Sequence, residues 1–141
     1  MMDYIFLVIP IFAWFSVQFF KFLADAFAHK RFNFRRIVET GGMPSSHSAV
    51  VTSLMTAIGI TQGFDSPLFA MSFVSGVIVM YDAAGVRRAA GKQATILNEL
   101  MNSKQIKIER QVKLKELLGH TPIEVVCGAI YGIVVAAVFL I

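Results

Sequence analysis

The chain has 141 residues, of which 56% are hydrophobic and 16% charged, and its mean hydropathy is +0.66. This balance excludes an ordinary soluble globular domain and indicates an integral membrane protein. In such a protein the position of the net charge of +4 matters more than its size, so we expect no nucleic-acid partner. The single cysteine, Cys127, excludes disulfides and a multi-cysteine metal site.

Four apolar stretches approach the 20 or so residues that a membrane-spanning helix needs: Tyr4–Ala24, Ser48–Gln62, Pro67–Ala84 and Ile123–Ile141. The first lacks a positively charged start and a small-residue cleavage site, so we expect it to be a retained helix rather than a signal peptide. We predict an all-α integral membrane bundle of about four transmembrane helices, forming one domain over residues 1–141.

The thirteen Lys and Arg residues are absent from the first twenty positions, from the short connection at 63–66, and from every position after Lys115. With four spans, the two basic segments fall on one side, which the positive-inside rule assigns to the cytoplasm. Both termini are then outside. The second basic segment has Ile96, Leu97, Leu100 and Met101 at helical spacing. The stretch that follows, SKQIKIERQVKLKELLG at 103–119, is charged and amphipathic, so we expect a cytoplasmic amphipathic insert there.

The first polar motif, TGGMPSSHSA at 40–49, precedes the second apolar helix. A helix start offers unpaired N–H groups and partial positive charge, which together suit a phosphate. Ser45, Ser46 and His47 would add hydroxyl and imidazole groups at that point. The alternative is that a serine is an ordinary N-cap.

The second polar motif, GHTPIEVVCG at 119–128, precedes the fourth apolar helix. His120 and Glu124 are four residues apart, so the carboxylate can hold one imidazole nitrogen and leave the other as a nucleophile. Alternatively, Thr121 and Glu124 form a capping box. Further along, Gly128 and Gly132 have the spacing that lets helices approach closely in a membrane, although small residues are common there.

The third motif, YDAAGVRRAAGKQA at 81–94, follows the third apolar helix and carries Asp82, Arg87, Arg88 and Lys92. Arginine binds phosphate well in a bidentate manner, but charges that flank a span are also common. Because all three motifs lie at the same membrane face, two histidines, a carboxylate and several cations meet there. This combination favours a phosphoryl-transfer site.

These motifs resemble those of the type 2 phosphatidic acid phosphatase and vanadium haloperoxidase superfamily. PSSHS at 44–48 is similar to its Pro-Ser-Gly-His motif, and HTPIEVVCG at 120–128 to its His-x-x-x-Asp motif. Together with YDAAGVRRAAGKQA, they are more specifically similar to a small divergent branch of that superfamily.

The resemblance implies metal-independent and cofactor-independent hydrolysis through a phosphohistidine. His120 would attack phosphorus, Glu124 would orient His120, and His47 would protonate the leaving oxygen. Ser45 and Ser46 would hold the phosphoryl oxygens with nearby cations, for which the candidates are Lys21, Arg35, Arg36, Arg87, Arg88 and Lys92. Lys21 has a plainer alternative, in which its side chain reaches the headgroups.

The chain departs from the superfamily pattern in its phosphate-binding cations. The Lys-x6-Arg-Pro motif is missing, and Lys113 and Leu114 stand where a Ser-Arg pair is expected. Glu124 and Ser46 replace the usual Asp and Gly. The sequence therefore leaves open which cations bind phosphate.

Our leading hypothesis is a lipid phosphatase of the bacterial plasma membrane, with its site facing the cytoplasm. Phosphatidylglycerophosphate, phosphatidic acid and an isoprenyl pyrophosphate would all satisfy the site. The competing hypothesis is a non-catalytic scaffold or lipid-headgroup binder. A binder needs only the cations, so the presence of both histidines and the carboxylate favours the enzyme. The chain is shorter than the six-helix core typical of that superfamily. A second copy would help to bury the polar site, so a homodimer is also predicted.

Overall fold

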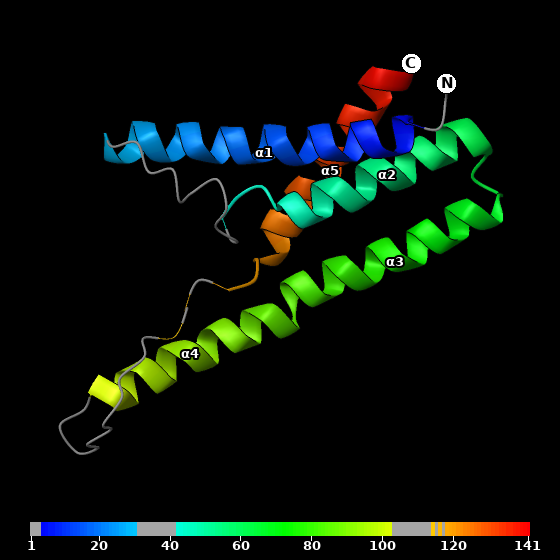
Figure 1. Cartoon of the computed structure of the whole chain (residues 1–141). Helices are drawn as coiled ribbons and strands as arrows, with labels where there is room; N and C mark the ends of the chain where they lie inside the picture. The colour runs from blue at the N-terminus through cyan, green and yellow to red at the C-terminus, as the bar shows by residue number, and fades with distance from the viewer. Residues whose placement is uncertain (1–3, 31–41, 103–113, 115, 117) are drawn as a thin grey trace.

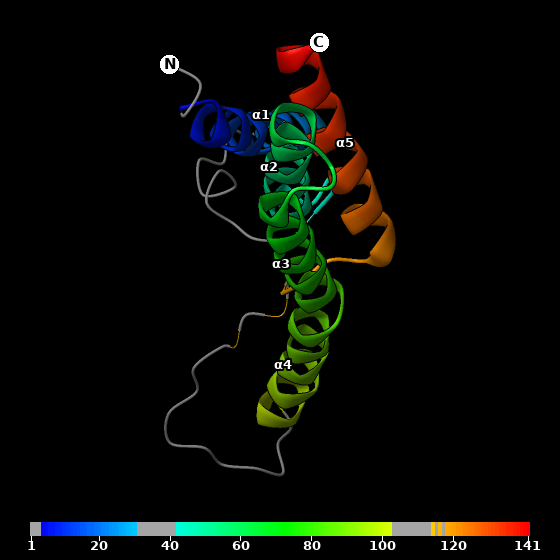
Figure 2. The same cartoon turned by 90° about the vertical axis from the view of Figure 1, so that its right-hand side faces the viewer.

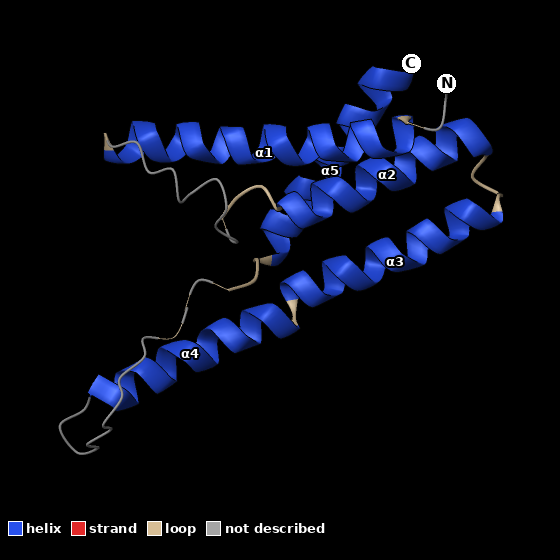
Figure 3. Ribbon diagram, in the orientation of Figure 1, coloured by secondary structure: helices blue, strands red, loops and turns tan. Residues whose placement is uncertain are grey.

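The computed structural model describes residues 4–30, 42–102, 114, 116 and 118–141. Within these residues the elements are α1 (Ile5–His29), α2 (Ser46–Gln62), α3 (Pro67–Ala84), α4 (Val86–Asn102) and α5 (Pro122–Leu140). The described parts contain helices and no strand (Figure 3). The predicted all-α membrane bundle is confirmed.

Three helical segments are long and apolar enough to cross a membrane: Ile5–Ala28, Pro67–Met101 and Pro122–Leu140. The helix α2, which we expected as a fourth span, has 17 residues and is about 26 Å long, less than the ~30 Å of a hydrocarbon core. It packs against α1, α3 and α5, and eight of its residues are buried. A helix covered by protein in this way need not be as long or as apolar as one that faces lipid.

The helices run back and forth between two ends of the bundle (Figures 1 and 2). The start of α1, the turn between α2 and α3, and the C-terminus lie at one end. The starts of α2 and α5 and the end of α3 lie toward the other, and α4 continues beyond α3 after Gly85. The three polar motifs are therefore brought toward the same end.

Local sequence explains where the helices of this bundle begin. The Ser45 hydroxyl accepts from the Ser48 N–H at 3.4 Å, and Ser66 caps α3 in the same way, with Pro67 at the first helical position. At the start of α5, Thr121 and Glu124 form a full capping box. Each cap satisfies amides that a helix start leaves without an intrahelical acceptor.

The close contact between α2 and α5 depends on two glycines. A Cβ on Gly128 would collide with the backbone of Ser45, and one on Gly132 would collide with Thr52 and Ala49. The Thr52 hydroxyl lies 3.0 Å from the Ala129 carbonyl oxygen of α5 and 2.7 Å from the Ser48 carbonyl oxygen of its own helix. The close approach predicted from the glycine spacing is therefore present.

The apolar core lies at the end that holds the C-terminus. It is built from α1, α2 and α5 by Ile9, Ala13, Ala57, Val135 and Ala136. Near it, the Tyr131 hydroxyl of α5 donates to the Ser16 hydroxyl of α1 at 2.8 Å. This packing joins the three helices and leaves the opposite end free for polar side chains.

Candidate active site

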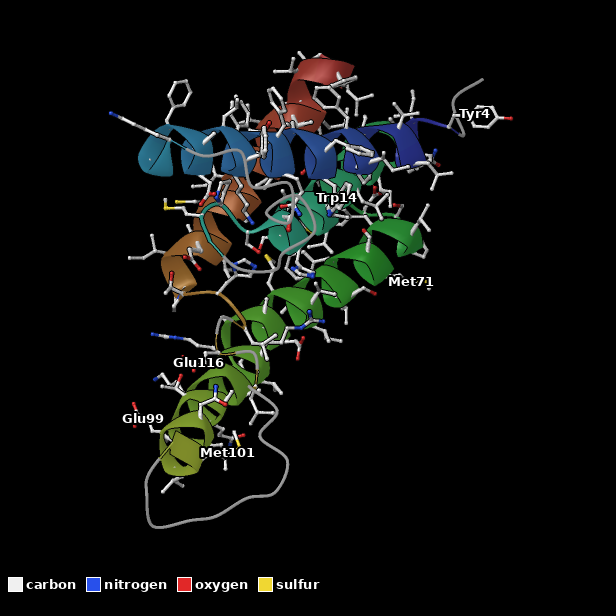
Figure 4. All side chains as sticks on the ribbon, turned by 60° about the vertical axis from the view of Figure 1, so that its left-hand side comes forward. Tyr4, Trp14, Met71, Glu99, Met101 and Glu116 are labelled. Carbon is white, nitrogen blue, oxygen red and sulfur yellow. The ribbon has the colours of Figure 1, made fainter. Side chains whose placement is uncertain are left out.

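The segment before α5 is held along α4. The Asn98 side chain, only 4% exposed, bonds both backbone groups of Leu114 at 2.9 Å and the Glu116 carboxylate at 2.7 Å. Figure 4 shows Glu116 beside α4. Gly119, with φ +82°, then approaches the backbone of Arg87 and Arg88 more closely than a side chain would allow. The residues before α5 thus contact α4 at Asn98 and again near its start at Arg87 and Arg88.

Two backbone hydrogen bonds fix the start of α5 against its neighbours. The His120 N–H donates to the Ala83 carbonyl at the end of α3 at 2.9 Å. The Ser45 N–H donates to the Glu124 carbonyl at 3.0 Å. These bonds place the two histidine motifs side by side, and the rings of His47 and His120 have centroids 5.9 Å apart.

Glu124 makes both of the contacts that the sequence left as alternatives. Its Oε2 atom accepts from the Thr121 N–H at 2.9 Å, which completes the capping box, and lies 3.3 Å from His120 Nδ1. A proton on Nδ1 directed at this oxygen leaves the lone pair on Nε2. The geometry therefore suits a nucleophilic His120.

Lys21 of α1 is buried rather than extended to the surface, with 5% of its area exposed. Its positive charge lowers the pKa values of both His47 and His120. The charge of Arg87 also lowers the pKa values of both rings. Its Nε donates a hydrogen bond to Asp82 Oδ2 at 2.6 Å. Two cations from different helices therefore lie near the histidine pair.

The pKa values of both histidines are lowered, with burial as the main cause. For His47 the next causes are the charges of Arg87, His120 and Lys21, with Asp82 acting in the opposite direction. For His120, Lys21 lowers the pKa and Glu124 raises it. Both rings thus favour the neutral form, which for His120 is the nucleophilic form.

The remaining predicted ligands have different surroundings. Ser45 is fully buried and acts as the N-cap of α2, and Ser46 is 6% exposed in the first turn. Lys92 is exposed on α4, and Arg88 is half-buried where Gly119 packs. Neither is among the charges that act on the histidines. The predicted ligands Arg35 and Arg36 lie outside the described residues.

Sequence reasoning missed several positioning groups. Asp82 was part of a motif, but its pairing with Arg87 was not predicted. The Ala83 carbonyl and the Asn98 side chain left no chemical signal of their own, because their partners are distant in sequence and include backbone groups. A glycine directly before His120 was the one visible hint that the chain passes close to another backbone there.

The chain belongs to the Divergent PAP2 family, whose sequence model matches residues 2–135. It is also similar to the Uncharacterized membrane protein YuiD of Bacillus subtilis (strain 168), with 46% identity over 121 residues and 77% of each chain covered. No solved structure matches. The resemblance drawn from the histidine motifs is therefore confirmed at the level of the family.

Proposed function

We propose that this membrane protein is a lipid phosphatase that hydrolyses a phosphomonoester or pyrophosphate through a phosphohistidine. The observation that carries the proposal is that the rings of His47 and His120 lie with their centroids 5.9 Å apart. Glu124 Oε2 lies near His120 Nδ1, and the charges of Lys21 and Arg87 lower the pKa values of both rings. Family membership supports a phosphatase-like relation.

The two histidines differ in a way that supports the roles proposed for them. His120 is fixed by Glu124, as a nucleophile must be. His47 Nδ1 is buried and has no hydrogen-bond partner among the described residues. A ring that is not tied to a carboxylate can gain and lose a proton during the reaction, which is what a general acid and base does.

In the first step, His120 Nε2 attacks phosphorus and the bond between phosphorus and the leaving oxygen breaks. His47, in its protonated form, donates a proton to that oxygen. A bound phosphate favours this form, because its negative charge opposes the effect of Lys21 and Arg87 on His47. The carboxylate of Glu124 stabilises the positive charge that develops on His120.

In the second step, water attacks the phosphohistidine. His47, now neutral, accepts a proton from that water, the bond between Nε2 and phosphorus breaks, and inorganic phosphate leaves. His120 and His47 then return to their starting states. Lys21, Arg87 and the first-turn amides of α2 are our candidates for holding the phosphoryl oxygens during both steps, because both cations influence the histidine pair and a helix start favours an anion.

The position of the site supports a lipid as the substrate. A phosphate site at one end of a membrane bundle meets amphiphiles with an anionic headgroup, such as phosphatidic acid, phosphatidylglycerophosphate or an isoprenyl pyrophosphate. The deciding experiment is phosphate release from this panel by purified protein, with and without EDTA. We expect release in both conditions and inhibition by vanadate. Binding of the lipids without release would favour the headgroup-binding protein instead.

The site is proposed to face the cytoplasm of a bacterial plasma membrane. The two basic segments directly precede the two histidine motifs in the sequence, and basic segments favour the cytoplasmic side. Cysteine substitutions in a Cys127→Ser background test this. Asp65→Cys, in the turn between α2 and α3, should react with an impermeant reagent added outside intact cells. Lys92→Cys should react only after permeabilisation, and the reverse pattern would overturn the orientation.

Association into a homodimer is a separate proposal that follows from the small number of helices. Its motivation is that α3 leaves most of its apolar surface uncovered by other described residues. Mass measurement of the detergent-solubilised protein decides between one copy and two.

A further inference from the structure

An apolar groove of about 450 Å³ lies between α3 and α5. On α3 it is lined by Val77, Met80 and Tyr81, and on α5 by residues from Val125 to Ile133. Eight residues of helix correspond to about 12 Å, so the groove runs well into the apolar part of α5. It exists because α3 and α5 both pack against α2 and have few contacts with each other.

Two lining residues of this groove are sequence neighbours of residues in the candidate site. Val125 directly follows Glu124, which holds His120. Tyr81 directly precedes Asp82, which holds Arg87, and Ala83 accepts the His120 N–H. The groove is therefore a candidate path for the apolar part of a ligand whose phosphoryl group lies at the histidines.

A second, smaller groove of about 260 Å³ lies between α2 and α3. It runs from Val51 and Val79 toward Ile58 and Leu68. None of its lining residues is adjacent in sequence to Glu124, Asp82 or His120, and Val51 lies one helical turn after His47 on α2. The two grooves thus offer a comparison, because both are mostly apolar and only the first is lined by sequence neighbours of Glu124 and Asp82.

We propose that the groove between α3 and α5 holds a hydrocarbon chain of the lipid whose phosphate lies at His120, and that the lipid enters sideways from the bilayer. The inference rests on the proposed function. The neighbouring chemistry supports this occupant: a phosphate site beside cations, and an apolar groove lined by Val125, the residue after Glu124, suit one amphiphile with its head at the site and its chain in the groove. The groove would then select for chain-bearing substrates.

The test uses Ala129→Phe, which places an aromatic ring in the groove. Its matched control is Ser75→Phe, which places the same ring in the groove between α2 and α3. Both purified proteins are assayed in detergent with long-chain phosphatidic acid, a short-chain analogue, and p-nitrophenyl phosphate, which has no chain. We expect Ala129→Phe to lower kcat/KM for the long-chain lipid at least tenfold, with little change for p-nitrophenyl phosphate. Ser75→Phe should leave the ratio of the two unchanged.

An unchanged ratio in Ala129→Phe, or the same loss in both variants, would overturn the assignment of the groove. A second readout does not depend on turnover: phosphatidic acid with a photoactivatable chain should label residues 125–133 and 77–81 in the wild type and lose this labelling in Ala129→Phe. Labelling spread evenly over the lipid-facing helices would also overturn it. If the wild type releases no phosphate from any substrate, the proposed function fails, and the labelling alone decides whether the groove holds a lipid chain.

Discussion

The two ends of the bundle are held together in different ways. At one end, α1, α2 and α5 pack through apolar side chains such as Ile9, Ala13 and Val135. At the other, the contacts are hydrogen bonds between backbone groups, from Ser45 to Glu124 and from His120 to Ala83, around buried polar side chains. Helices α1, α2 and α5 therefore provide the packed end, and α3 joins the starts of α2 and α5 at the polar end.

The difference indicates how a small membrane protein can keep polar groups buried although their removal from water costs free energy. A buried lysine and two histidines with lowered pKa values do not stabilise a bundle by themselves, because burial removes them from water. The apolar end supplies packing, and the glycine contacts between α2 and α5 connect the two ends. We therefore expect substitutions at the polar end to change chemistry and those at the apolar end to change stability.

The largest expected effect tests this division directly. His120→Ala removes the proposed nucleophile but keeps the backbone bond to Ala83, so we expect turnover to fall about 1000-fold or more with little change in melting temperature. Ile9→Ala should do the opposite: a loss of about 2 kcal/mol in stability, with turnover per folded molecule retained. Turnover and thermal unfolding are measured on the same samples. Normal activity in His120→Ala would remove the phosphohistidine mechanism.

A smaller effect is expected for the second histidine, and it should depend on the substrate. His47→Ala should lower turnover of a lipid phosphate roughly 100-fold, because the poor alkoxide leaving group needs a proton. The loss should be clearly smaller for p-nitrophenyl phosphate, whose phenolate leaves without one. An equal loss for both substrates would mean that His47 acts in binding rather than as the acid.

The contact that connects the two ends can be changed without touching the histidines. Gly128→Ala pushes a methyl group into the Ser45 backbone, so we expect a destabilisation of about 2 kcal/mol. The control is Gly76→Ala on α3, whose added carbon would meet Val51 at an ordinary 3.6 Å. Thermal unfolding in detergent should separate the two variants. Equal melting temperatures would show that the helices can move apart at little cost.

Much of this arrangement was predictable from the sequence. The apolar stretches and their turns predicted α3 as Pro67–Ala84, because Gly63 and Pro67 mark the connection before it. The spacing of His120 and Glu124 predicted their contact. The extent of α1 was underestimated: we expected its end at Ala24, but it continues through a polar stretch to His29. Periodicity and hydropathy alone do not show where such a helix stops.

The limits of sequence reasoning are clearest for the cations. Lys21 lies in α1, far along the chain from either histidine, and only packing brings it to them. Arg87 and Arg88 are neighbours in sequence, but Arg87 acts on the histidines while the backbone of Arg88 packs against Gly119. Which of two adjacent arginines faces a site depends on helix rotation after the break at Gly85, and no local pattern encodes that rotation.

The two roles considered for Glu124 can be tested by changing Thr121 and Glu124 separately. Thr121→Ala removes the hydroxyl that accepts from the Glu124 N–H but leaves the carboxylate near His120, so it should cost about 1 kcal/mol of stability and little activity. Glu124→Gln keeps a capping oxygen but loses the negative charge beside His120, so turnover should fall more than stability. Unchanged turnover in Glu124→Gln, together with a lowered melting temperature, would leave capping as its only role.

The smallest expected effect is a change in pH dependence caused by Lys21. Its positive charge disfavours protonation of both histidines, so removing it in Lys21→Met should raise both pKa values. Because kcat/KM reports the ionisation of the free enzyme, and His120 must be neutral to attack, the acid side of the profile should move to higher pH. The control is Lys92→Met, since Lys92 is exposed on α4 and is not among the charges acting on either ring. The substrate titrates identically in all three assays, so a difference between the variants comes from the protein. A profile that falls in amplitude but does not move would limit Lys21 to binding phosphate, and would show that its charge does not set the ionisation of the histidine pair.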